Sequence, residues 1–158
     1  MDELARRVGE RLKAANAMLA TAESCTGGWA AQVVTSVAGS SAWFDRGFIT
    51  YSDAAKQELL GVRPETLRSH GAVSEQTARE MARGALERSK ATIALSITGV
   101  AGPGGGTREK PVGMVCFAWS RGGEVRSETS HFPGDRESVR RQSVVLALEG
   151  VLRTLEGA

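Results

Sequence analysis

The sequence predicts an α/β fold, a three-layer α/β/α sandwich around a mixed, mostly parallel sheet of about five to six strands. Two observations carry this prediction. Short apolar or β-branched segments alternate with longer ones in which apolar residues recur at helical spacing. Residues 91–98, Ala-Thr-Ile-Ala-Leu-Ser-Ile-Thr, are almost wholly apolar. Such a run is typical of a strand covered on both faces, so we expect it at the centre of the sheet.

The N-terminal segment predicts a helix, a strand and a second helix. Residues 2–15 place apolar side chains at helical spacing between charges, which indicates a surface helix packed on one face. Residues 18–22, which begin with the apolar run Met-Leu-Ala, predict the first strand. A helix is expected over residues 27–37, and the small residues 38–41 end it.

The middle of the chain predicts one strand and three helices. Residues 44–51 have the composition of a strand. Two short helices are expected at 54–60 and 64–71, because capping residues or a proline precede each and a glycine ends each. Ser74 then caps a longer helix that runs to about Lys90.

The C-terminal third begins with the expected central strand and a glycine-rich loop over residues 99–111. Residues 112–120 and 124–132 then read as two strands joined by a pair of glycines, which predicts an antiparallel hairpin. Asp135 caps the last helix, whose apolar side chains form one stripe.

Composition narrows the class of protein. A chain of 158 residues is expected to form a single domain over 1–158 with its own core. A net charge of +2 and the absence of basic runs interleaved with aromatic residues argue against a nucleic-acid partner. With no apolar run of membrane length, no secretory leader and only Cys25 and Cys116 as cysteines, we expect a reduced, cytoplasmic protein without a membrane partner.

The stretch Thr-Ala-Glu-Ser-Cys-Thr-Gly-Gly at residues 21–28 is the main candidate site. It joins a strand to a helix start, where unpaired N–H groups and the positive end of the helix dipole suit a phosphate, a carboxylate or a developing oxyanion. Ser24, Cys25 and Thr26 all carry nucleophile-type side chains. From the spacing alone, an equally good interpretation is that small residues cap the helix and allow close packing.

The loop 99–111 matches neither the Walker nor the Rossmann phosphate motif. Its glycines would nevertheless let backbone N–H groups approach a ligand at the carboxyl end of the central strand, where open α/β sheets place their sites. Ser24 and Thr98 would meet at this edge if their strands are parallel. The alternative is a flexible surface loop.

Base and metal candidates are few. His70 and His131 form no ligand pair and no cysteine cluster exists, so neither a metal nor another cofactor is expected, and a Ser-His-Asp triad is weakly supported. A lysine with a lowered pKa can replace histidine as the base. Lys56, with Tyr51 five residues before it, is a candidate, although a solvated lysine is the more common case.

Taken together, several motifs resemble the CinA C-terminal domain family along nearly the whole chain. They are the segments 21–28, Tyr51-Ser52 with Ala55-Lys56, Leu60-Gly61-Val62, His70 to Ser74, Thr98 to Gly106, Lys110 to Gly113, and Phe132 to Arg136. The resemblance implies a stand-alone amidohydrolase that converts nicotinamide mononucleotide to nicotinate mononucleotide and ammonia in NAD salvage, the pyridine nucleotide cycle. It also implies a homodimer or a higher homo-oligomer.

The resemblance further implies roles for individual residues. Ser24 would be the nucleophile, Lys56 and Tyr51 the activating and proton-shuttling groups, and Thr98 a further site hydroxyl. Implied substrate-binding residues are Thr26, Gly27, Gly28, Gly102, Gly104, Gly105, Arg136 and Arg140. Arg136 and Arg140 lie four apart on one helix face, and Arg140 is slightly favoured. N–H groups near residues 26–28 would stabilise the oxyanion.

Three alternatives stay open. Cys25 is the rival nucleophile, since a helix N-terminus lowers the pKa of a thiol. The domain could instead be a nucleotide-binding regulatory module without turnover. It could also be an interaction partner in DNA uptake or repair, although the modest charge argues against direct DNA contact.

Overall fold

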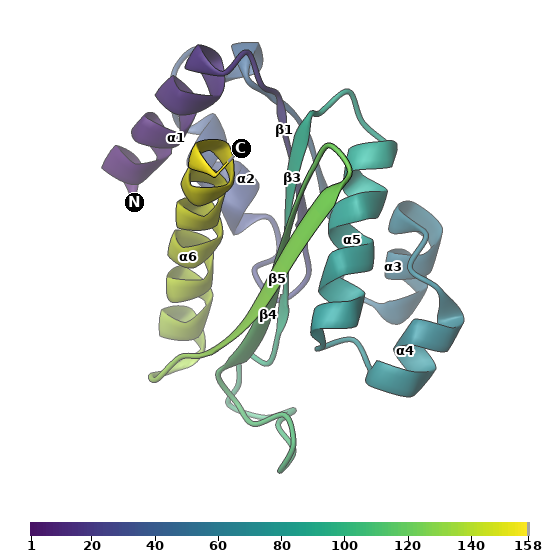
Figure 1. The fold of residues 1–158 in the computed structure, drawn as a ribbon. Helices are drawn as coiled ribbons and strands as arrows, with labels where there is room; N and C mark the ends of the chain where they lie inside the picture. Colours follow the sequence, from purple (N-terminus) through teal and green to yellow (C-terminus); the bar gives the residue numbers. More distant parts are fainter. Residues whose placement is uncertain (158) are drawn as a thin grey trace.

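The computed structural model describes residues 1–157 and contains one five-stranded sheet with the strand order β2-β1-β3-β4-β5 (Figure 1). The strands are β1 (Leu19–Glu23), β2 (Phe44–Ile49), β3 (Ile93–Gly99), β4 (Met114–Arg121) and β5 (Glu124–His131). β1 pairs in parallel with both β2 and β3, whereas β4 pairs antiparallel with β3 and β5. The predicted mixed α/β sheet, its central strand and the hairpin are therefore confirmed.

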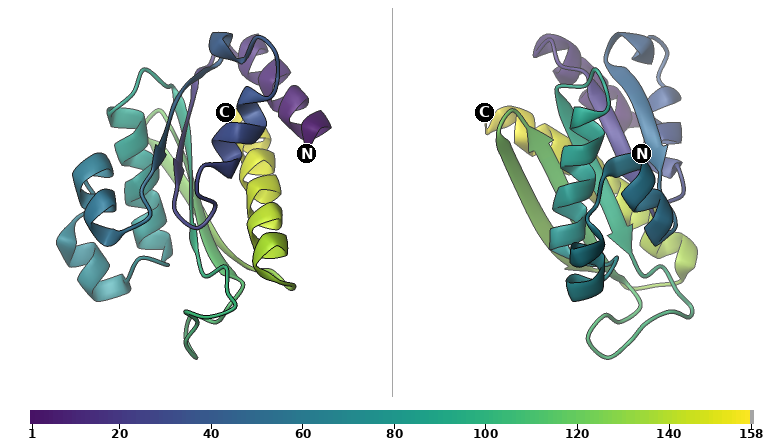
Figure 2. Two further views of the ribbon diagram at one scale, coloured as in Figure 1. Left: turned by 180° about the vertical axis from the view of Figure 1, so that it is seen from behind. Right: turned by 90° about the vertical axis from the view of Figure 1, so that its right-hand side faces the viewer.

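Helices cover both faces of the sheet, as Figure 1 and the two views of Figure 2 show. One layer holds α1 (Asp2–Ala14), α2 (Trp29–Thr35) and α6 (Arg136–Glu156). The opposite layer holds α3 (Asp53–Leu60), α4 (Pro64–His70) and α5 (Glu75–Glu87). The three-layer arrangement matches the expectation, since each helix buries one apolar stripe against the sheet or a neighbouring helix.

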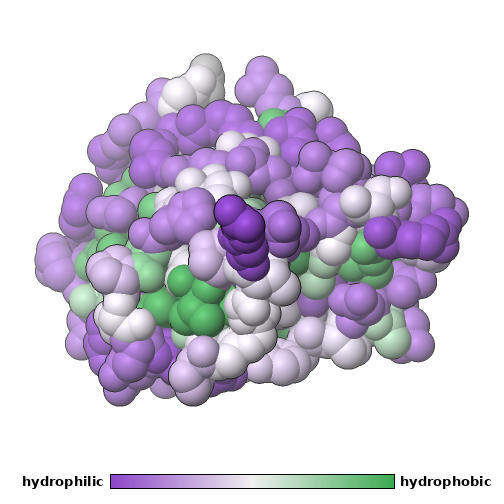
Figure 3. Space-filling view, turned by 90° about the horizontal axis from the view of Figure 1, so that it is seen from below, coloured by the Kyte–Doolittle hydropathy of each residue, from purple (hydrophilic) through white to green (hydrophobic). Residues whose placement is uncertain are grey.

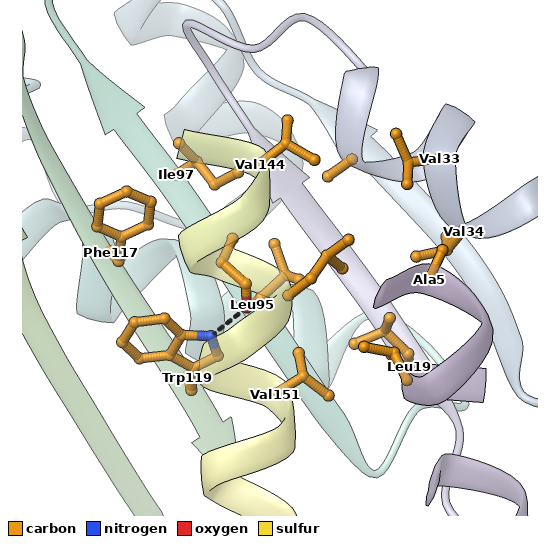
Figure 4. Packing of buried hydrophobic residues seen from close by; sticks show 14 of the residues in the cluster. Ala5, Leu19, Val33, Val34, Leu95, Ile97, Phe117, Trp119, Val144 and Val151 are labelled. Carbon is orange, nitrogen blue, oxygen red and sulfur yellow. Dashed lines mark hydrogen bonds between the residues drawn. The ribbon is translucent and has the colours of Figure 1, made fainter. Parts of the chain in front are cut away.

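The face of the sheet under α6 carries the large side chains (Figure 4). Alternate residues of β3 and β4, including Leu95, Ile97 and Phe117, point to this side because successive strand residues face opposite sides. Trp119 anchors the layer: its indole N–H donates to the Ala147 carbonyl of α6 at 2.9 Å. This face forms the larger part of the hydrophobic core.

The face under α5 carries small side chains, among them Ala20, Ala22 and Ala94. Small residues on α5 meet them, and Ser96 of β3 donates a 2.6 Å hydrogen bond to the Ala78 carbonyl of α5. The lack of bulk lets this helix lie close to the sheet. α3 then packs against the outer side of α5.

Two boundaries near the candidate site differ from the sequence prediction. α2 begins at Trp29 rather than at residue 27, because Gly27 and Gly28 adopt left-handed conformations with φ of 59° and 104°. β1 extends to Glu23 instead of ending at residue 22. A 3-10 helix over Ser40–Ala42 was not predicted.

Within residues 1–157, no helix is both long and apolar enough to cross a membrane.

Candidate active site

Ser24 directly follows β1 and lies at the carboxyl end of the parallel strands. Its N–H donates to the Ile97 carbonyl at 2.9 Å, so the serine backbone is held beside the central strand β3. The chain then turns, and the Gly27 N–H donates back to the Ser24 carbonyl at 3.0 Å. Ser24 is therefore fixed from both sides at the sheet edge where α/β proteins place their sites.

Lys56 reaches this serine from α3. Ser52 begins the helix by accepting the Ala55 N–H at 3.0 Å, and Lys56 follows in its first turn. The Lys56 side chain is only 1% exposed. Its Nζ lies 2.9 Å from Ser24 Oγ and donates to the carbonyls of Thr50 at 2.8 Å and Tyr51 at 3.2 Å.

Burial lowers the pKa of Lys56, because the charged ammonium loses its hydration; nearby Asp53 acts more weakly in the opposite direction. No carboxylate of residues 1–157 forms an ion pair with it. A neutral amine has two N–H donors and one lone pair. The three oxygen neighbours of Nζ suit both forms of the side chain: an ammonium donates to all three, whereas the neutral amine donates to the two carbonyls and can accept from the Ser24 hydroxyl.

A cavity of about 290 Å³ opens over this pair. The predicted site residues that line it are Ser24, Tyr51, Lys56, Thr98, Gly104, Gly105 and Arg136. Cys25, Ala72, Val73, Gly99, Val100 and Ala101 complete the lining. The glycine-rich loop therefore forms one wall of the cavity, beside the ends of β1 and β3.

Tyr51 and Arg136 meet at the cavity. The Tyr51 side chain is 61% exposed and its phenol oxygen accepts from Arg136 at 3.1 Å, while Arg136 also donates to the Gly102 carbonyl at 2.7 Å. The phenol makes no hydrogen bond to Ser24 or Lys56 in the described chain; the Tyr51 backbone carbonyl makes that contact instead. Thr98 donates to the Ala72 carbonyl at 2.8 Å and so ties β3 to the segment before α5.

Arg140 holds the turn that follows Ser24 and does not line the cavity. Its guanidinium donates to the carbonyls of Cys25 at 3.0 Å and Thr26 at 3.2 Å and lies 5.4 Å from the Trp29 ring. Arg136, one turn earlier, lines the cavity. The geometry thus favours Arg136 over Arg140 as a ligand-binding residue, contrary to the preference from sequence.

Four other candidates also lie outside the cavity lining: Thr26, Gly27, Gly28 and Gly102. Thr26 is buried, and its hydroxyl donates to the Glu23 carboxylate at 2.7 Å. The glycines at 27 and 28 supply the left-handed turn. Gly102 contributes its carbonyl to Arg136.

Cys25 lines the cavity but is a poor thiolate. Burial raises the pKa of its thiol to about 11, outweighing the opposing influence of its own backbone amide and of Arg140. The expectation that a helix N-terminus would lower this pKa was wrong, because the loss of solvent dominates.

Glu23 was not singled out from the sequence. Its buried carboxylate accepts the N–H groups of Ala30 and Ala31 at the start of α2. The positive end of this helix, expected to receive a ligand anion, is therefore occupied by an anion of the protein itself. A signal was present in the sequence: an acidic residue ends a strand that otherwise holds only apolar residues and one threonine.

Within residues 1–157, no three His, Cys, Asp or Glu side chains gather in a way that could hold a metal ion. The face seen from below, toward which the loop 99–111 extends, is largely hydrophilic with several separate hydrophobic patches (Figure 3). Ile49 and Val112 are among the exposed large hydrophobic residues of the molecule.

The chain is similar to proteins of known family along nearly its whole length. The CinA C-terminal domain model matches residues 1–155. The nicotinamide-nucleotide amidohydrolase PncC of Escherichia coli (strain K12) is 55% identical over 148 residues, which cover 93% of this chain and 90% of the relative. The protein of the same name from Pseudomonas putida is 53% identical over 151 residues, covering 95% and 94%.

Solved structures of CinA-type proteins have the same fold as this chain. The competence/damage inducible protein CihA from Agrobacterium tumefaciens superposes with a TM-score of 0.94 at 49% identity, covering 98% of this chain and 94% of that one. A CinA superfamily protein from Klebsiella pneumoniae gives a TM-score of 0.96 at 42% identity, covering 99% and 98%.

Proposed function

Since this chain belongs to the CinA C-terminal domain family, we propose that it is a nicotinamide-nucleotide amidohydrolase in which Ser24 is the nucleophile and Lys56 the base. The substrate is nicotinamide mononucleotide, and the products are nicotinate mononucleotide and ammonia. The observation that carries the proposal is the 2.9 Å contact between Lys56 Nζ and Ser24 Oγ beside a cavity. This contact pairs a weak nucleophile with a base of lowered pKa.

The reaction begins with neutral Lys56. Its lone pair takes the Ser24 proton as Oγ attacks the carboxamide carbon, while the carbonyls of Thr50 and Tyr51 hold the two amine hydrogens. Collapse of the tetrahedral intermediate breaks the C–N bond, and Lys56 returns the proton to the leaving nitrogen as ammonia departs. Water then hydrolyses the acyl enzyme, with Lys56 again accepting and returning a proton.

The oxyanion needs hydrogen-bond donors near Ser24. The Gly27 N–H is used by the Ser24 carbonyl. The N–H groups of Cys25 and Thr26 donate no hydrogen bond to another residue of 1–157, and Arg140 holds the carbonyls of the same two residues. We assign the oxyanion to these N–H groups, the residue after the nucleophile being a common donor.

The rest of the substrate lies toward Arg136. This guanidinium contacts only the neutral oxygens of Tyr51 and Gly102 and forms no ion pair with the described carboxylates. It is therefore free to bind the substrate phosphate with charge-assisted hydrogen bonds. Gly104 and Gly105 bring loop backbone close to the same cavity.

Cytoplasmic location and self-association belong to the same proposal. Both cysteines are free thiols, as in a reducing compartment. β2 is an edge strand whose end carries Ile49, an exposed apolar side chain that a second copy could cover.

The test is ammonia release from nicotinamide mononucleotide by the purified protein, with EDTA present. We expect turnover that survives EDTA and falls by at least about 10³-fold in Ser24→Ala, as when other enzymes lose a serine nucleophile. Cys25→Ala is the matched control and should keep most of the activity. Folded protein that binds the nucleotide without releasing ammonia would overturn the proposal in favour of a binding module.

A further inference from the structure

All the hydrogen bonds that the Glu23 carboxylate accepts come from the segment that follows Ser24. One oxygen accepts the Thr26 hydroxyl at 2.7 Å and the Ala30 N–H at 2.8 Å, and the other accepts the Ala31 N–H at 3.1 Å. The side chain is 1% exposed. A buried carboxylate that receives three donors is well satisfied and well fixed in place.

The carboxylate compensates for a helix start that cannot cap itself. The N-cap position of α2 is Gly28, which has no side chain, and no side-chain cap bond is made there. Glu23 supplies that function from the preceding strand and places its charge at the positive end of the helix. No Lys, Arg or His of the described chain lies within ion-pair distance of it.

Glu23 and Ser24 lie on opposite sides of the sheet. Leu19 packs in the core under α6, while Ala20 and Ala22 pack under α5. Since alternation continues along an extended chain, Glu23 points toward α2 and Ser24 toward Lys56. A hydrogen bond made on one side therefore restrains the serine on the other.

The Glu23 backbone is also connected to Lys56, through Thr50. Its carbonyl accepts the Thr50 N–H at 2.8 Å, and the Thr50 carbonyl accepts from Lys56 Nζ at 2.8 Å. The residue is therefore bonded to the turn that follows Ser24 through its side chain and to the lysine anchor through its main chain.

We propose that Glu23 is a positioning residue for the reaction: its carboxylate fixes the turn so that Ser24 Oγ meets Lys56 and the Cys25 and Thr26 N–H groups face the developing oxyanion. The inference rests on the proposed role of Ser24. Loosening the turn should lower the rate of bond formation more than substrate binding, since misplacement by about 1 Å can cost about 10²-fold.

Glu23→Gln tests the role with almost no change of volume. One carboxylate oxygen becomes an amide NH₂ that cannot accept an N–H of α2. We expect kcat for nicotinamide mononucleotide to fall by about 10- to 100-fold with KM within about threefold. The rate at which diisopropyl fluorophosphate labels Ser24, followed by mass spectrometry, should fall by at least about tenfold.

Glu80→Gln is the matched control. Glu80 is also a helix-capping carboxylate: it accepts the Arg63 N–H at 2.9 Å and the Thr66 hydroxyl at the start of α4, outside the catalytic cavity. The Glu80→Gln variant should lower the melting temperature about as much as Glu23→Gln does, while leaving kcat and the labelling rate within about twofold of wild type. Thr26→Val, which removes one donor to Glu23 and keeps the charge, should show a smaller loss of the same kind and serves if Glu23→Gln does not fold.

The readouts separate the two proposals. Wild-type protein that is labelled at Ser24 but releases no ammonia would overturn the substrate assignment and leave the labelling test of Glu23 intact. Unchanged labelling and kcat in folded Glu23→Gln, or losses matched by Glu80→Gln, would overturn the positioning role. Failure of the reagent to label Ser24 in the wild type would also overturn it, since no activated serine would remain to be positioned.

Discussion

Three consecutive residues at the end of β1 have different roles because their side chains leave the chain in different directions. Glu23 turns toward α2, Ser24 toward Lys56, and Cys25 is buried at the cavity wall. Burial also has opposite consequences for the two titratable groups. It lowers the pKa of Lys56, which frees a base, and raises that of Cys25, which suppresses a thiolate.

The lowered pKa of Lys56 predicts a pH dependence. Only the neutral amine can accept the Ser24 proton, so kcat/KM should fall as the pH falls through the pKa of Lys56 and should level off at a pH below about 10.4, the pKa of a solvated lysine. Lys56→Met should lower kcat by about 10²- to 10⁴-fold, and the exposed Lys13→Met should not. A kcat/KM that stays constant between about pH 5 and about pH 10 would contradict the assignment of Lys56 as the base.

At the scale of elements, the position of Lys56 depends on how closely α5 approaches α3. Gly84 of α5 lies against the end of α3: a Cβ at this position would come within 1.9 Å of the Leu60 carbonyl oxygen. Backbone cannot yield as a flexible side chain can. The glycine therefore sets the separation of the two helices, and α3 is the helix that carries Lys56.

Gly84→Ala should displace α3 as well as strain the fold. We expect the free energy of unfolding to fall by about 1–3 kcal/mol, as for other overpacked sites, and kcat to fall with it because Lys56 moves relative to Ser24. Denaturant unfolding and steady-state kinetics measure the two effects. Gly123→Ala, where an added Cβ meets nothing within 4 Å, is the control and should change neither.

At the scale of the whole molecule, the cavity is assembled from segments far apart in the chain. Arg136 from the first turn of α6 bonds the phenol after β2 and the carbonyl of Gly102 in the loop after β3. The parallel arrangement of β2, β1 and β3 brings these segments to one edge. The part of the cavity lined by Arg136 therefore exists only when the sheet and α6 are both in place.

Arg136→Ala should weaken recognition of the phosphate. Loss of a hydrogen bond to a charged group costs about 1.5–3 kcal/mol, so KM for nicotinamide mononucleotide should rise by about 10- to 100-fold. KM for nicotinamide riboside, which lacks the phosphate, should change little. Arg141→Ala on the same helix, where the side chain pairs with Glu137 on the surface, should leave both values unchanged. An equal rise for both substrates would place Arg136 away from the phosphate.

The sequence by itself determined the order and type of the helices and strands, because apolar periodicity and capping residues act within a few neighbouring positions. It also pointed to Ser24 and Lys56, through the motifs that carry the family resemblance. Only the tertiary structure distinguished the surroundings of Arg136 and Arg140, which share a helix face but lie one turn apart, against different neighbours. It likewise revealed Glu23 and the high pKa of Cys25, since burial and hydrogen-bond partners come from segments that only folding brings together.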